Sequence, residues 1–221
     1  MIFKLIDEAL LEHQFIKEME TDSTYFYKRE VDNAIRFTIL YKLDQLCSPK
    51  ELNATINQSL PEALINNPSF KKNCDLVCIH HLPQLSDFKE YEEQIFAIEE
   101  DPHFFKKYVF YYSNAEEHIL KSQSYNTLKA IVANKELFNE YKDQPLMATH
   151  YSVAAKIFIK LPFFELPFDP TELVPLRLQT EEAVSEIGLI NIYEKIQKLN
   201  NNNIDDLIEE MISEELANIQ N

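Results

Sequence analysis

A chain of 221 residues with 45% hydrophobic and 12% aromatic content is long enough to bury a sizeable core in one large domain or two small ones. This composition excludes a disordered chain, and no apolar run reaches the roughly 20 residues that a membrane-spanning helix needs, so we predict no membrane partner. The net charge of -16 argues against dominant, direct nucleic-acid binding, because such binding requires Lys and Arg to neutralise phosphates.

The sequence holds one glycine, Gly188. Phosphate-binding loops and nucleophile elbows need glycines where the backbone turns sharply or approaches a ligand closely. We therefore find no P-loop and no dinucleotide fingerprint, and we expect no cofactor. Cys47, Cys74 and Cys78 form no even set of disulfides, which predicts reduced thiols and a cytoplasmic protein.

The first third of the chain predicts a helix, a hairpin and a second helix. Apolar residues at helical spacing predict a helix over residues 2–17. Alternating residues predict a hairpin of strands 24–30 and 34–43, with turn chemistry at Asp32-Asn33. The run Ser48-Pro49-Lys50-Glu51 predicts a capping box that opens a helix to about residue 58.

The continuous apolar run over residues 74–82 predicts a central strand covered on both faces. We expect a helix over 87–98, a strand over 106–112 and a second capping box at Ser113-Asn114-Ala115-Glu116. Beyond Tyr125 the pattern is helical, with helices around 128–141, from Pro145 to 158, near 180–199 and over 204–219.

These elements predict an α+β fold, in which a small mixed sheet flanked by helices is followed by a helical C-terminal region. We expect an α/β domain over residues 1–124 and a helical region over residues 125–221, with a docking arm at 200–221. Residues 171–221 hold eleven acids against three bases, which is half of the net charge.

Two arrangements of chemically active residues deserve weighing, and neither predicts a catalytic or metal site. His80-His81, with His103, Cys78 or Glu99, could bind a metal. However, neighbouring residues on a strand point to opposite faces, so the two histidines do not readily share one ion. Cys78 and His80 lie on one strand face, but no third group orients them, and buried packing is the better interpretation.

The order helix, hairpin, strand, helix, strand is similar to a restriction-endonuclease-like core. That chemistry needs an acid and then an acid-x-Lys on the next strand, which together hold Mg²⁺. Asp75 is a candidate for the first acid, and Asp87 and Lys89 have the right spacing, but they open a helix. A degenerate, inactive scaffold is the favoured interpretation. A Mg-dependent nuclease and an acidic inhibitor that mimics DNA stay as alternatives.

Two segments are candidates for partner binding. The loop over residues 161–170 combines three prolines with large apolar side chains, which either dock a partner or plug the core. The last helix follows four asparagines and has one apolar and one acidic face, which suits an arm for a partner with a basic rim. The predicted partner-binding residues are Phe163, Phe164, Phe168, Leu207, Met211, Ile212 and Leu216.

The run Ile98-Glu99-Glu100-Asp101-Pro102-His103-Phe104-Phe105-Lys106-Lys107-Tyr108-Val109 resembles a segment of the middle components of bacterial ABC-three-component systems. These include the small accessory subunit of Lamassu-type anti-phage systems. The layout of residues 1–125 is similar as well. The resemblance implies a non-catalytic subunit that bridges or regulates an SMC- or Rad50-like ATPase and an effector, often a nuclease, in anti-phage or anti-plasmid defence.

The same run has a structural interpretation. Pro102 disfavours helical backbone at Asp101 and ends the preceding helix. Phe104 and Phe105 are expected to anchor the following strand in the core, while Lys106 and Lys107 neutralise Glu99 and Glu100. The segment is thus either a helix–strand corner that holds the fold or a direct partner contact.

Overall fold

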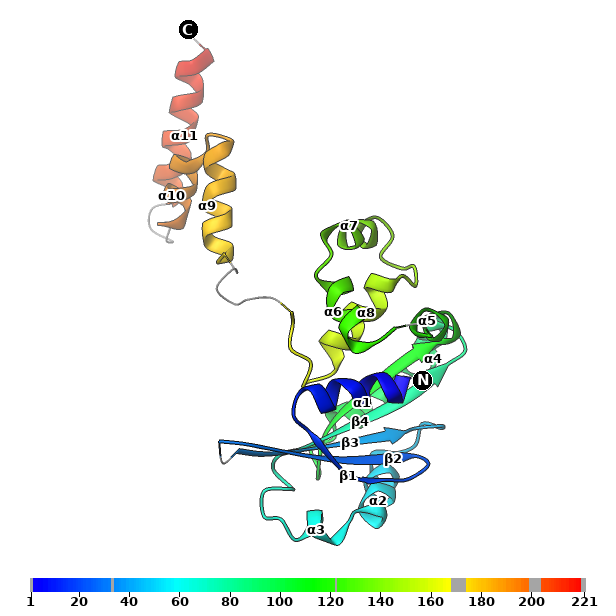
Figure 1. The fold of residues 1–221 in the computed structure, drawn as a ribbon. Coiled ribbons are helices and arrows are strands. Elements are labelled where there is room, and N and C mark those ends of the chain that lie inside the picture. The colour runs from blue at the N-terminus through cyan, green and yellow to red at the C-terminus, as the bar shows by residue number, and fades with distance from the viewer. Residues whose placement is uncertain (1, 33, 122, 168–173, 199–203, 220–221) are drawn as a thin grey trace. The chain divides into compact units, whose positions relative to one another are not determined.

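The computed structural model describes residues 2–219 except 33, 122, 168–173 and 199–203 (Figure 1). The chain forms two compact units, Met1–Pro167 and Phe168–Asn221, and we describe each by itself. The boundary lies later than the expected division at residue 124, because helices beyond Tyr125 bury apolar side chains in the same core as the N-terminal helix.

The first unit holds a five-stranded mixed sheet flanked by helices, which confirms the predicted fold class. Its strands, in chain order and also in sheet order, are β1 (Ile16–Glu20), β2 (Thr24–Val31), β3 (Ala34–Lys42), β4 (Cys74–Leu82) and β5 (Lys106–Ser113). The first three strands pair antiparallel, whereas β3, β4 and β5 pair in parallel. The parallel strands start at one edge of the sheet, so the residues that open them lie together.

Helices cover both faces of this sheet (Figure 1). One face packs against α2 (Pro49–Ser59), α3 (Glu62–Ile65) and α4 (Phe88–Glu100), the last of which follows a 3-10 turn, Leu85–Asp87. The other face packs against α1 (Ile2–Glu12), α5 (Asn114–Leu120), α6 (Tyr125–Val132) and α8 (His150–Lys160), with α7 (Lys135–Asp143) beside α6 and α8. The central strand β4 is buried on both sides, as its apolar run predicts.

Local capping chemistry fixes where helices begin. The Ser48 side chain accepts from the backbone N–H of Glu51 while the Glu51 carboxylate accepts from that of Ser48, which is the predicted capping box of α2. Ser113 and Glu116 form the second one, at α5. A third, between Thr149 and Ser152, opens α8, so the predicted start at Pro145 is wrong.

The N-terminal helix is shorter than predicted. It ends at Glu12, and Gln14 adopts a left-handed backbone with φ 65°, which turns the chain into β1. The predicted helix extends to residue 17 because the apolar spacing continues to Ile16. In the structure Ile16 belongs to β1 and is 67% exposed. Only pairing with β2 defines β1 as an edge strand.

The second unit is helical, which confirms that part of the predicted fold. It contains α9 (Leu176–Glu186), α10 (Ile190–Gln197) and α11 (Ile204–Ile219). Gly188 lies between α9 and α10 and takes φ 75°. Residues with a Cβ rarely adopt this backbone conformation, so glycine suits the turn between the two helices. Neither α9 nor α10 has a buried residue.

We expect Phe164→Ala to lower the free energy of unfolding of the first unit by about 3–5 kcal/mol, as for other buried aromatics. Phe164 is 8% exposed, and its ring meets those of Tyr125 and Phe158 at 5.1 and 5.2 Å between centroids. Urea unfolding measured by tyrosine fluorescence tests this. A variant as stable as the wild type would instead assign this ring to a docking surface.

Candidate partner-binding site

A helix–strand corner, residues 98–109, lies where α4 ends and β5 begins. The helix stops at Glu100, and Asp101 takes an extended backbone before Pro102, as predicted. The Lys107 side chain is fully buried behind the corner, with its ammonium 2.7 Å from Oδ2 of Asp101. It also donates to the carbonyl oxygens of His103 at 2.6 Å and Phe105 at 3.2 Å. One buried cation therefore holds both ends of the turn.

The corner is also tied to α2. Nδ2 of Asn53 donates to Oδ2 of Asp101 at 2.9 Å, and Asn53 is only 5% exposed. Burial raises the pKa of Asp101, but the bonds from Lys107 and Asn53 outweigh it and leave this pKa below its ordinary value. Asp101 is thus ionised at neutral pH. Sequence reasoning missed Asn53, although a polar residue beside Leu52 on the buried side of α2 was a signal.

The expected charge pairing within this run is wrong. Lys107 pairs with Asp101, and Lys106 is exposed, with its ammonium 5.3 Å from the centre of the Tyr108 ring. Glu99 accepts from the backbone N–H of Val109 at 2.8 Å and pairs with a lysine of α8, Lys160, at 2.6 Å. Glu100 is exposed. Periodicity could not assign these partners, because a residue 61 positions away takes part.

The two phenylalanines of the corner have opposite roles. Phe105 is 5% exposed and anchors β5 in the core, as predicted. Phe104 is 53% exposed and adopts φ 67°, a left-handed conformation that is strained for a bulky residue. Its predicted place in the core is therefore wrong. Phe104 instead borders a mostly apolar groove of about 630 Å³ against Pro49 and Ala54 of α2.

The proposed nuclease residues do not meet. Asp75 lies at the start of β4, whereas Asp87 and Lys89 follow its other end, and a nine-residue strand spans roughly 27 Å. The Asp75 carboxylate is instead paired with Arg36 at 2.8 Å. This placement contradicts the nuclease alternative built on these three residues. Among the described residues, no group of three or more His, Cys, Asp or Glu is placed to hold a metal ion.

The histidines and cysteines of β4 have structural partners. His80 is buried with Nδ1 2.7 Å from the carbonyl oxygen of Leu43, and His81 contacts Oδ1 of Asn114 at 2.8 Å. Burial raises the pKa of the Cys78 thiol, so it is not an activated nucleophile. Cys47, Cys74 and Cys78 are free thiols.

The predicted docking residues divide between the two units. Phe163 and Phe164 are buried in the core of the first unit, which answers the open question about them in favour of the core. Phe168 lies outside the described residues. On α11, Leu207 is half-buried, Met211 is 37% exposed and Ile212 is 54% exposed, while the surroundings of the Leu216 side chain are not described.

The first unit is an α+β fold, with a mixed sheet flanked by helices, and a helical unit follows it. The family model described as ABC-three component (ABC-3C) system Middle Component 1 matches residues 34–136. This segment of the chain, from β3 into α7, belongs to that family, which confirms the predicted resemblance and includes the whole corner. No curated protein and no solved structure matches the chain.

The description of this family, a middle component of an ABC-three-component system, is that of one subunit among several. No helix in the described ranges is both long and apolar enough to cross a bilayer. The match does not extend to the second unit, residues 168–221.

We expect Asp101→Asn to lower the free energy of unfolding by about 3–5 kcal/mol, because it leaves the Lys107 ammonium buried without a counter-charge. The pKa of Asp101 is lowered in the folded state, so its contribution is present above the pKa of the unfolded chain and is lost as pH falls through the folded-state value. Urea unfolding between pH 7 and pH 3 should therefore show the difference between variant and wild type shrinking with acidity. A constant difference would contradict this.

A matched pair of substitutions tests the two phenylalanines. Phe105→Ala should cost about 3–5 kcal/mol of unfolding free energy, as for other core aromatics. Phe104→Gly should stay within about 1 kcal/mol of the wild type, because relief of the left-handed strain offsets the greater freedom of glycine when unfolded. Thermal unfolding of both variants measures this, and equal losses would show that Phe104 also holds the fold.

Proposed function

We propose that this chain is a non-catalytic accessory subunit that bridges or regulates an SMC- or Rad50-like ATPase and its effector, a nuclease, in a Lamassu-type anti-phage or anti-plasmid complex. The accessory role follows from the family. The particular partners rest on the resemblance of the 98–109 segment and on the surfaces described next.

The exposed apolar side chains of the second unit support the proposal most strongly. Among residues 174–198 and the described side chains of α11, none is buried, so these helices have no core of their own in that part of the chain. Exposed apolar surface of this extent marks interaction sites. The large side chains that are more than a third exposed here are Val174, Leu176, Leu178, Ile187, Leu189, Ile196, Ile204, Ile208, Met211 and Ile212.

The chemistry of α11 suggests what it binds. Among its described side chains, the acids Asp205 and Glu209 are exposed beside the exposed apolar residues Ile208 and Met211, so the helix offers apolar and acidic surface together. A partner groove that is apolar in the centre and basic at its rim complements both features. We propose that α11 is the docking arm and that Leu207, Met211, Ile212 and Leu216 contact the partner.

Phe104 is the second proposed contact. Its side chain is exposed and its backbone is strained. The buried Lys107 fixes the turn that contains Phe104 through the carbonyl oxygen of His103, while the Phe104 ring itself is not part of the core. Strain retained at an exposed position suggests a role outside folding. Aromatic side chains beside a groove are frequent anchors of protein interfaces.

Co-expression with the SMC-like ATPase subunit that the proposal requires tests the docking arm. Met211→Ser with Ile212→Ser should reduce capture of the ATPase about tenfold or more, as the loss of two apolar contacts implies. The matched control is Leu146→Ser with Met147→Ser, an equally apolar pair that is 94% and 58% exposed in the first unit. Equal effects of both pairs, or a chain that stays alone in its host extract, would refute the proposal.

The same capture assay applies to the corner. Phe104→Gly is expected to weaken capture of a partner subunit about tenfold while the free energy of unfolding stays near that of the wild type. Unchanged capture by this variant would restrict the interface to the second unit.

A further inference from the structure

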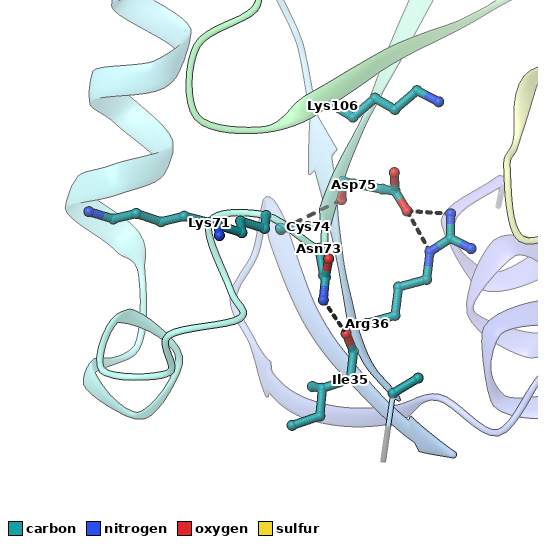
Figure 2. A pocket seen from close by; sticks show the side chains of 9 residues that line it. Ile35, Arg36, Lys71, Asn73, Cys74, Asp75 and Lys106 are labelled. Atoms are coloured by element: carbon teal, nitrogen blue, oxygen red, sulfur yellow. Dashed lines mark hydrogen bonds and ion pairs between the residues drawn. The ribbon is translucent and has the colours of Figure 1, made fainter. Parts of the chain in front are cut away.

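A basic pocket of about 410 Å³ opens at the edge of the sheet where β3, β4 and β5 begin (Figure 2). Its lining contains Arg36, Lys71, Lys72 and Lys106 and a single carboxylate, Asp75, which gives a local charge of +3. The whole chain carries -16. The pocket is therefore opposite in sign to the rest of the protein.

Strand register brings Arg36, Asp75 and Lys106 to one face of the sheet. In the sheet register, Asp75 of β4 lies opposite Lys106 of β5 and opposite Thr38 of β3. Arg36 lies two residues before Thr38 and therefore on the same face. Nε and Nη2 of Arg36 both donate to Oδ2 of Asp75, at 2.9 and 2.8 Å. Asp75 is 5% exposed and holds the guanidinium at the pocket, while the Arg36 side chain is 43% exposed.

The loop before β4 supplies the other two cations, and it is fixed to the sheet. Nδ2 of Asn73 donates to the carbonyl oxygen of Ile35 at 3.0 Å, and the backbone N–H of Phe37 donates to the carbonyl oxygen of Asn73 at 2.8 Å. Lys71 and Lys72, which precede this anchor, are exposed. In Figure 2 the side chain of Lys71 extends away from the Arg36–Asp75 pair, and its flexible stem allows the ammonium to turn toward a ligand.

No acidic side chain pairs with the lysines of the pocket in the described part of the chain. Within the described part of the chain, Lys71, Lys72 and Lys106 have no carboxylate within 4.0 Å. The hydrogen bond of Lys106 with Tyr108 raises its pKa, so this lysine keeps its charge at neutral and mildly basic pH. Three ammonium groups without a carboxylate partner, around one concave site, favour an anion that carries more than one charge.

We propose that this pocket binds a phosphate group, carried by a nucleoside polyphosphate or by the end of a nucleic-acid strand. A phosphate ester offers several acceptor oxygens and up to two charges, which match a guanidinium and several ammonium groups better than one carboxylate does. The volume suits a nucleotide-sized ligand. A long duplex is disfavoured, because its further phosphates would meet the acidic remainder of the surface. The site is independent of the partners proposed above.

Isothermal titration of the full chain tests the site with three probes: tripolyphosphate, ATP, and a short single-stranded oligonucleotide with or without a 5′-phosphate. We expect saturable binding of tripolyphosphate and ATP if the phosphate comes from a free nucleotide. We expect at least about a tenfold preference for the phosphorylated oligonucleotide if it comes from a strand end. Either pattern supports the site. No saturable binding of any probe at about 1 mM overturns it.

Variants assign the binding to this pocket. Lys71→Ala, Lys72→Ala and Lys106→Ala together should weaken it at least about tenfold and leave folding intact, since all three side chains are exposed. The matched control, Lys4→Ala, Lys89→Ala and Lys135→Ala, removes the same charge from exposed positions elsewhere and should change affinity less than about twofold. Equal loss in both triple variants, or binding of a polyglutamate peptide in place of the phosphates, would overturn the proposal.

Discussion

The buried ammonium of Lys107 is the interaction on which the first unit depends. It neutralises Asp101, donates hydrogen bonds to the carbonyl oxygens of the turn and thereby joins the end of α4 to the start of β5. Through Asp101 and Asn53 it also reaches α2, so two helices on one face of the sheet and the strand β5 meet at one charge. Removing one partner would leave a buried charge uncompensated, at a high cost in unfolding free energy. The contacts of Lys107 therefore stabilise the corner together. It lies within the segment that the family model matches.

Glu99 extends the same corner to the opposite side of the sheet. β5 is the last strand in the sheet order, so its outer side has no neighbouring strand. The Glu99 carboxylate accepts the hydrogen bond from the backbone N–H of Val109 in place of such a strand. Its pairing with Lys160 connects this edge to α8, which packs on the other face. This ion pair adds to the apolar packing by which α6 and α8 share a core with the N-terminal helix and sheet.

This packing leaves exposed the side chains that the functional proposals concern: Phe104, the cations of the basic pocket and the apolar residues of the second unit. Phe104 is pushed outward because Phe105 fills the core, and the cations of the basic pocket gather because three parallel strands begin at one edge. The second unit lacks a buried core in its described part, so its apolar side chains need another surface. The family model that matches residues 34–136 describes a middle component of a multi-subunit system, and exposed surfaces of this kind are what the proposed accessory role requires.

Local pattern alone determined the hairpin, the strand over residues 74–82, the capping boxes at Ser48 and Ser113, and the stop of α4 before Pro102, because each depends on residues close in sequence. The 98–109 run also indicated the family. The tertiary structure decided that β1 is a strand, that Lys107 pairs with Asp101 and Glu99 with Lys160, and that Phe104 faces solvent. These outcomes depend on which side chains and strands meet in the folded chain. The spacing of residues along the sequence does not contain that information.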